Sequence, residues 1–145
     1  QALDVASVAG EFHYGTASSS FGDYVNQIGM YAAAGSSGWA FKVNGVSAPV
    51  GADKVVLKDG DTVLWYWATF GPAGGPPTLE LQRLPGNCYV VQSVTDAGRR
   101  TRAATATLVV DGKRFRTRSG RGCVGKHVGL VRAVAPGAVR SNALR

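Results

Sequence analysis

The chain has 145 residues, of which 45% are hydrophobic and 17% are charged, which fits a soluble globular protein. A chain of this length buries roughly two-thirds of the surface that its unfolded form exposes, enough for one ordinary core or two small ones. No run of about 18 apolar residues occurs, so we expect no membrane-spanning segment. The first residues show neither a basic region nor an apolar run, so we expect any signal peptide to have been removed.

Charge is distributed unevenly along the sequence. Residues 1–70 hold three lysines and six carboxylates, a net charge of −3, whereas residues 77–145 hold eleven arginines, two lysines and three carboxylates, a net charge of +10. The change falls at the uncharged, Pro/Gly-rich segment 71–77. We therefore predict two modules, residues 1–70 and 78–145, joined by a linker at residues 71–77.

The first module opens with an apolar stripe of roughly helical spacing over residues 3–9, which ends at Gly10 and predicts a short helix. Residues 11–20 look irregular, with core anchors at Phe12, Tyr14 and Phe21. Residues 21–34 fit either a strand or a ligand-facing loop.

Two strands organise the rest of this module. Residues 39–43 and 62–68 alternate bulky with smaller residues, and each strand adjoins a turn dipeptide, Asn44-Gly45 or Asp59-Gly60. Trp39, Phe41 and Val43 should share one face of the first strand, and Val63, Trp65 and Trp67 should share one face of the second. Since the second strand is apolar on both faces, we expect it to be central in its sheet.

These segments resemble a known family. The Leu3-Asp4 helix opening, the segment from Gly38-Trp39 to Asn44-Gly45, and the turn 57–61 leading into Val63-Leu64-Trp65 are similar to the bacterial domain related to the C-terminal domain of transcobalamin and intrinsic factor. The resemblance covers about half the chain and implies a ubiquitin-like β-grasp fold. That family has a β-hairpin before the helix, which is missing here. We expect either that the chain is a fragment or that another segment or subunit supplies the strands.

The second module is predicted to be a small β-sandwich. Short strands are expected at residues 78–84, 88–94, 104–111, 113–117 and 128–133, separated by turn signals. The run 106–112, with 117–122 and the closing segment 140–144, resembles immunoglobulin-like or carboxypeptidase-regulatory-like modules of bacterial surface proteins. Such modules commonly continue into one more strand, so this end also looks one element short.

The two cysteines both lie in the second module. Cys88 and Cys123 fit a single disulfide that closes a loop of 36 residues and stabilises the module by roughly 4 kcal/mol. A disulfide implies an oxidising compartment, hence a secreted or cell-surface bacterial protein. Two buried free thiols are the alternative.

Catalytic chemistry is not indicated. The two histidines, His13 and His127, lie in different modules, and we expect the first to be packed and the second solvated. Asp59 and Asp61 flank a turn glycine, where carboxylates usually bond to the backbone. We expect a non-enzymatic protein without a metal site or cofactor.

Aromatic residues are the first candidate binding site. The set at the end of the first module comprises Trp39, Trp65, Tyr66, Trp67 and Phe70. In relatives of the transcobalamin-like family the corresponding sheet helps to cover a corrinoid, together with a helical domain that this chain lacks. The alternative is that Trp39 and Trp65 form the core while the others pack against the linker and second module.

Arginines are the second candidate. A basic stripe along two hairpins could bind a polyanion, either nucleic acid or an acidic cell-wall polymer, through Arg99, Arg100, Arg102, Arg114, Arg116, Arg118 and Arg121. The alternatives are a solvated surface, or contact with the acidic module of a neighbouring copy.

Three functions therefore remain open. The first is a structural or assembly protein, possibly a filament subunit whose copies, or another surface protein, complete its sheets by strand addition. The second is a binding module for a corrinoid or another flat hydrophobic molecule. The third is polyanion binding through the arginines.

Overall fold

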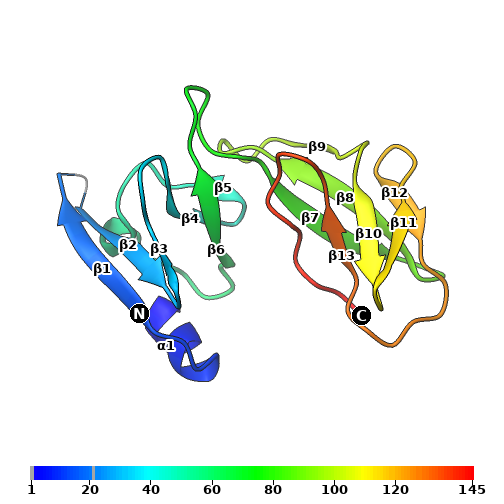
Figure 1. Cartoon of the computed structure of the whole chain (residues 1–145), viewed down its shortest axis with the longest axis horizontal. Coiled ribbons are helices and arrows are strands. Elements are labelled where there is room, and N and C mark those ends of the chain that lie inside the picture. Colours follow the sequence, from blue (N-terminus) through cyan, green and yellow to red (C-terminus); the bar gives the residue numbers. More distant parts are fainter. Residues whose placement is uncertain (1, 21) are drawn as a thin grey trace. The chain divides into compact units, whose positions relative to one another are not determined.

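The computed structural model in Figure 1 describes residues 2–20 and 22–145. The chain divides into two compact units, Gln1–Gly75 (unit 1) and Pro76–Arg145 (unit 2). Both are built from small antiparallel sheets, and the single described helix is short. The prediction of a mainly β protein with one short helix is therefore confirmed. Nowhere in the described residues is a helix long and apolar enough to cross a bilayer.

In its described residues, 2–20 and 22–75, unit 1 has one helix, six strands and a single 3₁₀ turn. The elements are α1 (Ala2–Ala9), β1 (Tyr14–Ser19), β2 (Gly22–Ile28), β3 (Tyr31–Ala32), β4 (Ser37–Val43), β5 (Val46–Ser47), η1 (Ala52–Lys54) and β6 (Val63–Thr69). They form two antiparallel sheets, in the orders β1-β2-β3 and β5-β4-β6. The helix predicted for residues 3–9 is present, and the Gly10 N–H closes its last turn on the Ala6 carbonyl.

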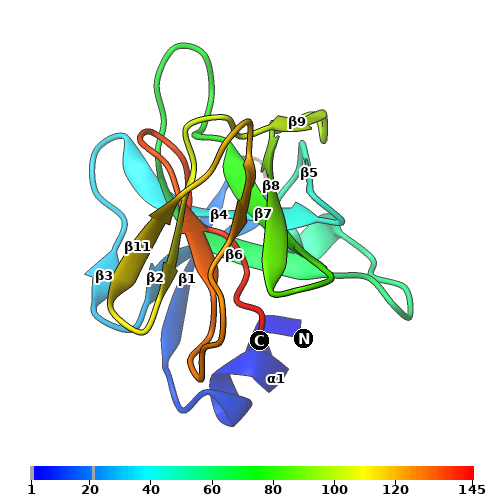
Figure 2. The same ribbon diagram turned by 90° about the vertical axis from the view of Figure 1, so that its right-hand side faces the viewer.

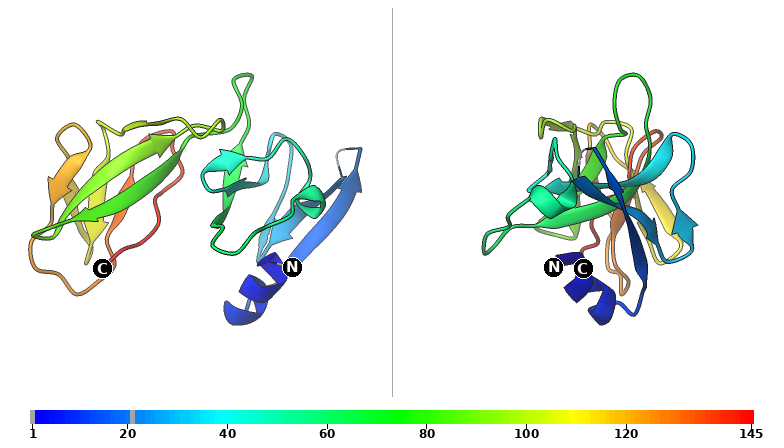
Figure 3. Two further views of the ribbon diagram at one scale, coloured as in Figure 1. Left: turned by 180° about the vertical axis from the view of Figure 1, so that it is seen from behind. Right: turned by 90° about the vertical axis from the view of Figure 1, so that its left-hand side faces the viewer.

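The β1–β2 hairpin, which rises from the end of α1 in Figure 3, corrects one expectation. Residues 11–20 looked irregular because Ser18, Ser19 and Ser20 carry no apolar alternation. In the structure, β1 pairs along β2, with a register shift between Gly15 and Thr16. Residues 22–28 form a strand, whereas the expectation for Phe21 lies outside the described residues.

Strands β4 and β6 pair without a register shift, from Ser37 opposite Thr69 to Val43 opposite Val63. Each predicted set lies on one face of its strand, and the pairing brings the two sets onto the same face of the sheet. We call this the aromatic face; it consists of Trp39, Phe41, Val43, Val63, Trp65 and Trp67.

The expectation that the second of these strands is central was wrong. β4 is central, and β6 lies at the edge of the sheet. An edge strand can be apolar on both faces while part of its apolar surface stays uncovered; in β6, Tyr66 and Ala68 are buried. Leu64 and Trp67, on opposite faces of β6, are 38% and 37% exposed.

Unit 2 contains seven strands: β7 (Thr78–Leu84), β8 (Cys88–Val94), β9 (Arg100–Arg102), β10 (Thr107–Val110), β11 (Lys113–Arg116), β12 (Arg121–Cys123) and β13 (Arg132–Val134). One sheet has the order β12-β8-β7, with β9 also on β8, and the other has the order β11-β10-β13. Figure 2 shows these two sheets as separate layers of the unit. Their inward side chains share one buried cluster that includes Leu81, Tyr89, Val91, Leu108 and Ala133. This packing of two sheets over one core is that of a β-sandwich.

The long edge of β7 is sealed by the closing segment of unit 2. The Leu79 N–H donates to the Val139 carbonyl at 3.0 Å. The Asn142 side chain accepts from the Leu81 N–H at 2.8 Å and donates to the Leu81 carbonyl at 3.1 Å. A seven-residue edge therefore receives hydrogen-bond partners from within its own unit.

A disulfide joins Cys88 to Cys123 across the paired strands β8 and β12. The predicted pairing is therefore present, and it fits folding in an oxidising compartment. It closes the 36-residue loop on the outer side of the sheet that contains β8.

We expect the double variant Cys88→Ala/Cys123→Ala to lower the free energy of unfolding of unit 2 by up to about 4 kcal/mol, because the unfolded loop is no longer constrained. All three tryptophans, Trp39, Trp65 and Trp67, lie in unit 1, so Trp emission reports that unit alone. Urea unfolding followed by circular dichroism should show the shift, while the Trp-monitored transition stays in place. Equal shifts of both signals would contradict an effect confined to unit 2.

Candidate functional site

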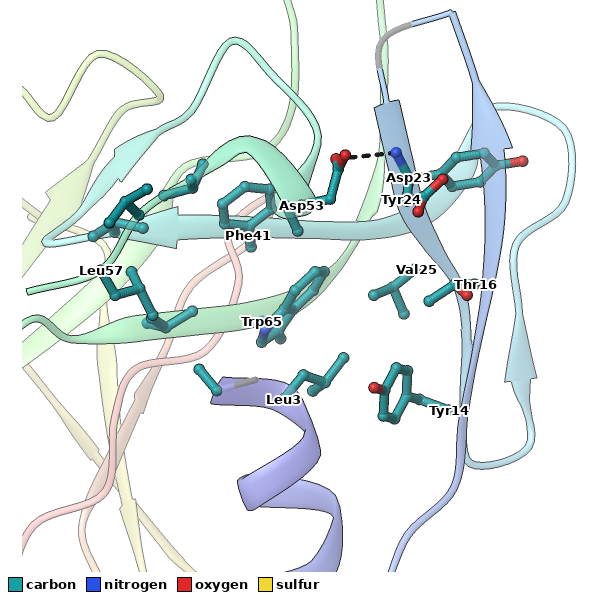
Figure 4. A pocket seen from close by; sticks show the side chains of 16 residues that line it. Leu3, Tyr14, Thr16, Asp23, Tyr24, Val25, Phe41, Asp53, Leu57 and Trp65 are labelled. Carbon is teal, nitrogen blue, oxygen red and sulfur yellow. Dashed lines mark hydrogen bonds between the residues drawn. The ribbon is translucent and has the colours of Figure 1, made fainter.

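A cavity of about 510 Å³ opens beneath the aromatic face of unit 1, and Figure 4 shows its lining. Its walls come from α1, from the β1–β2 hairpin, from β4 and β6, and from the segment that begins at η1. The lining residues are Ala2, Leu3, Tyr14, Thr16, Asp23, Tyr24, Val25, Phe41, Val43, Ala52, Asp53, Val55, Val56, Leu57, Val63 and Trp65. A volume of this size is typical of small-molecule sites.

The cavity has an apolar floor and partly exposed walls. Phe41 and Trp65 lie side by side, with ring centroids 5.0 Å apart. Leu3 of α1 and Val25 of β2 are buried against it, whereas Val56 is 89% exposed. The six side chains of the aromatic face are all at least partly exposed. Unit 1 therefore keeps aromatic surface open where a closed domain would bury it.

Two polar contacts fix the rim of the cavity. The Asp53 carboxylate accepts a hydrogen bond from the Asp23 N–H at 3.0 Å, shown as the dashed line in Figure 4. It also pairs with the Lys54 ammonium at 2.8 Å, and this contact holds the pKa of the Asp53 carboxyl below its ordinary value. At Gly22, where φ is 111°, a Cβ would lie 2.6 Å from the Asp53 carboxylate. Asp53 therefore links η1 to β2, and both of its carboxylate oxygens are engaged in these structural contacts.

A further polar contact links α1 to β1. The Tyr14 hydroxyl donates a hydrogen bond to the Asp4 carboxylate. This bond lowers the pKa of the Asp4 carboxyl and raises that of the Tyr14 phenol. Because Leu3 and Tyr14 both line the cavity, the bond fixes two of its walls relative to each other.

The aromatic residues named from the sequence occupy three places. Trp65 lines the cavity, whereas Trp39 and Trp67 form a neighbouring pair on the same face, with ring centroids 5.6 Å apart. Tyr66 lies on the opposite face, where the Lys42 ammonium is 5.7 Å from its ring centroid. Phe70 follows the end of β6 and is exposed.

Sequence reasoning missed most of the cavity. Phe41 had been placed on the correct face, and Tyr14 had been expected to be a core anchor. Leu3, Val25 and Asp53 come from segments far apart in the chain, and their convergence depends on the β1–β2 hairpin that the sequence did not indicate.

The outer edge of β6 is the second feature of the site. The Asn44 N–H donates to the Thr62 carbonyl, and the Phe70 N–H donates to the Ser36 carbonyl. Antiparallel alternation therefore directs the even-numbered residues of β6 toward β4. The N–H and C=O groups on the other edge belong to Val63, Trp65, Trp67 and Thr69, and within the described residues no strand pairs with that edge.

Two other edge strands in the described part of the chain, β1 and β11, differ from this one. Strand β1 is rich in Ser, Thr and Gly, and β11 reads Lys-Arg-Phe-Arg. Such polar and charged edges resist association. β6 reads Val-Leu-Trp-Tyr-Trp-Ala-Thr, seven residues without charge, Pro or Gly.

The seven arginines do not form one stripe, because unit 2 distributes them over its two sheets. Arg114 and Arg116 lie on the outer side of the β11-β10-β13 sheet, where their partners in β10 are Val109 and Thr107. Arg132, which sequence reasoning had not named, joins them opposite Val109. Arg118 follows the end of β11 and pairs with Arg121 in an isolated bridge.

The remaining arginines belong to the other sheet. Arg100, Arg102 and Arg121 lie on the outer side of the sheet that contains β8, opposite Val94, Gln92 and Val90, and Arg99 is exposed beside them. The Arg100 guanidinium contacts both carboxylate oxygens of Glu80 at 3.0 Å. Three arginines thus face outward on each sheet, and polyanion binding by either face stays a prediction.

The histidines are also separate. The His13 Nε2 lies 3.5 Å from the Gln27 Nε2, and the His127 Nε2 lies 3.3 Å from the Tyr89 hydroxyl. Across residues 2–20 and 22–145, no cluster of three or more His, Cys, Asp or Glu side chains is arranged to hold a metal ion.

Comparison with known proteins gives one family match, and it covers the part of the chain that contains the candidate site. Residues 3–69 match the family model described as Domain of unknown function (DUF4430). No curated protein and no solved structure matches the chain. The DUF4430 region contains β6 and every cavity-lining residue except Ala2, and it is followed by the β-rich unit 2.

The bond between Tyr14 and Asp4 should make the docking of α1 depend on pH. Because the folded-state pKa of Asp4 is lowered, its stabilising effect is present at neutral pH and disappears as the pH falls through that pKa, below about 4. Amide exchange in α1 should accelerate there. Tyr14→Phe should exchange faster already at neutral pH, while Tyr24→Phe, which alters an exposed tyrosine, should match the wild type. Unchanged exchange in Tyr14→Phe would contradict the link.

Proposed function

We propose that the protein is a non-enzymatic assembly module of the bacterial cell surface or extracellular space, and that its unit 1 receives an added β-strand along β6. The open edge of β6 carries this proposal. Four residues of that strand present their N–H and C=O groups away from β4. Strand addition satisfies such groups through main-chain hydrogen bonds and gains specificity from pockets beside the strand.

The cavity supplies such a pocket. Val63 and Trp65 line it through their side chains and belong to the open edge through their backbones. A strand added to β6 places alternate side chains on the aromatic face, next to these two residues. Apolar side chains there would cover Phe41 and Trp65, which are only partly buried. The fitting partner is therefore an extended segment with apolar residues at alternate positions.

The family resemblance supports the domain types proposed for the two units, and the disulfide supports the proposed cellular location. A helix followed by a sheet with a turn at Asn44-Gly45 is consistent with a β-grasp domain similar to the transcobalamin C-terminal family, and the β-sandwich of unit 2 is consistent with an immunoglobulin-like module. The Cys88–Cys123 disulfide supports a secreted or cell-surface location.

A ligand-binding function is the second candidate, and the 510 Å³ cavity favours it. The adjoining side chains of Phe41, Trp65 and Val25, with the two rings inclined by 33°, offer an apolar surface to a flat hydrophobic molecule. A whole corrinoid exceeds this volume, so the cavity would contact only part of it.

The test of strand addition uses a proline at the open edge. Thr69→Pro removes one outward N–H without removing a bond to β4, and Thr69→Ala is its control, because both variants lose the hydroxyl contact with Ser37. Light scattering over a concentration series should show that the wild type and Thr69→Ala self-associate and that Thr69→Pro does so about tenfold more weakly. A wild type that stays monomeric throughout would overturn the proposal.

The test of ligand binding uses Trp emission. A panel of cobalamin and smaller planar aromatic compounds should include one that quenches the wild type, and the quenching should be lost in Trp65→Phe but kept in Trp67→Phe, whose indole lies outside the cavity. Emission unchanged across the panel would count against this function.

A further inference from the structure

We propose that the partner strand is β6 of a second copy, paired antiparallel about a two-fold axis centred on Tyr66. This inference rests on the proposed strand addition and specifies its partner and register. In the pair, Val63 lies opposite the partner's Thr69, and Trp65 lies opposite the partner's Trp67. The two sheets then join into one continuous sheet of order β5-β4-β6-β6-β4-β5.

Backbone geometry selects this register. Only odd-numbered residues of β6 present outward N–H and C=O groups, so only they can form hydrogen-bonded pairs across the new edge. A two-fold axis pairs residues whose numbers have a constant sum. Centring the axis on Tyr66 engages all four residues, Val63, Trp65, Trp67 and Thr69, in each copy. Moving the axis by one position, to Trp65 or Trp67, leaves one outward residue of each strand without a partner.

Side-chain chemistry favours a second copy over a different partner. When a strand pairs with its own copy about a two-fold axis, its charged side chains come close to charges of the same sign. This repulsion is unfavourable. β6 carries no charge, whereas self-pairing of β11 would bring arginines and lysine together. On the aromatic face, the pairing sets each Trp65 beside the partner's Trp67, and aromatic pairs of this kind stabilise sheets.

The exposed apolar side chains of β6 also favour pairing with a second copy. Trp67 is 37% exposed on the aromatic face, and Leu64 is 38% exposed on the other face, where Tyr66 and Ala68 are buried, so Trp67 and Leu64 offer apolar surface to a neighbour. The partner's Trp67 would extend the row formed by Val63 and Trp65 beside the cavity. Because a two-fold interface closes on itself, this contact makes a dimer, and a filament requires a second contact elsewhere.

Cysteine cross-linking tests the register. In hydrogen-bonded antiparallel pairs the Cα atoms lie about 5.5 Å apart, within the range of a disulfide. Along one strand, residues 63 and 69 are about 20 Å apart and cannot join. The double variant Val63→Cys/Thr69→Cys should therefore oxidise to a covalent dimer, with peptide mapping showing the 63-to-69 linkage. The single variants Val63→Cys and Thr69→Cys are matched controls and should stay uncross-linked.

The outcomes separate this inference from the proposed function. If the double variant associates in light scattering but does not cross-link, or if a single variant cross-links to itself, the register is wrong while strand addition stands. If the wild type does not associate, both fail.

A second measurement needs no variant. Amide exchange of the wild type at rising concentration should slow at Trp65, Trp67 and Thr69 and stay constant at Tyr66 and Ala68, whose N–H groups already face β4. Uniform slowing along β6, or none, would overturn the register even if the cysteine variants failed to fold.

Discussion

The antiparallel pairing of β4 with β6 is the constraint on which the rest of unit 1 depends. Its uninterrupted register sets Trp39 against Trp67 and Phe41 against Trp65, which creates the aromatic face. The same register directs alternate backbone groups of β6 outward. The turn below it is fixed by Asn44, which accepts from the Thr62 N–H and donates to the Asp61 carboxylate. The Lys58 N–H and the Asn44 amide together lower the pKa of the Asp61 carboxyl, which favours its charged, bonded form.

The two units differ in whether the outer edge of a long strand has hydrogen-bond partners. In unit 2, the seven-residue β7 receives backbone and side-chain partners from Val139 and Asn142, and eleven buried residues form one core cluster. In unit 1, the seven-residue β6 keeps one edge unpaired in the described structure, and a cavity lies beside it. A closed sandwich needs no partner for stability, whereas an uncharged open edge beside exposed indoles favours association.

Local sequence patterns predicted the structural features that depend on residues close together in the chain. The faces of β4 and β6, strands β7 and β8 and the short helix follow from alternation and turn residues, and the disulfide follows from cysteine count. Features that depend on the order of strands in a sheet did not follow from these local patterns. Apolar side chains on both faces of β6 suggested a central strand, since alternation says nothing about neighbours. Arg114 and Arg102 look like parts of one stripe until the topology places them on different sheets.

Val63 and Trp65 connect the two candidate functions of unit 1 physically. Their side chains line the cavity while their backbones form half of the open edge. A molecule that packs against Trp65 restricts its rotamer and the local backbone, and a strand that bonds to that backbone does the same. Since the side chains of an added strand would also cover Phe41 and Trp65, which line the cavity, the two proposed binding events would draw on the same surface. The proposed assembly and the proposed ligand binding would in this sense be two uses of one incompletely covered sheet.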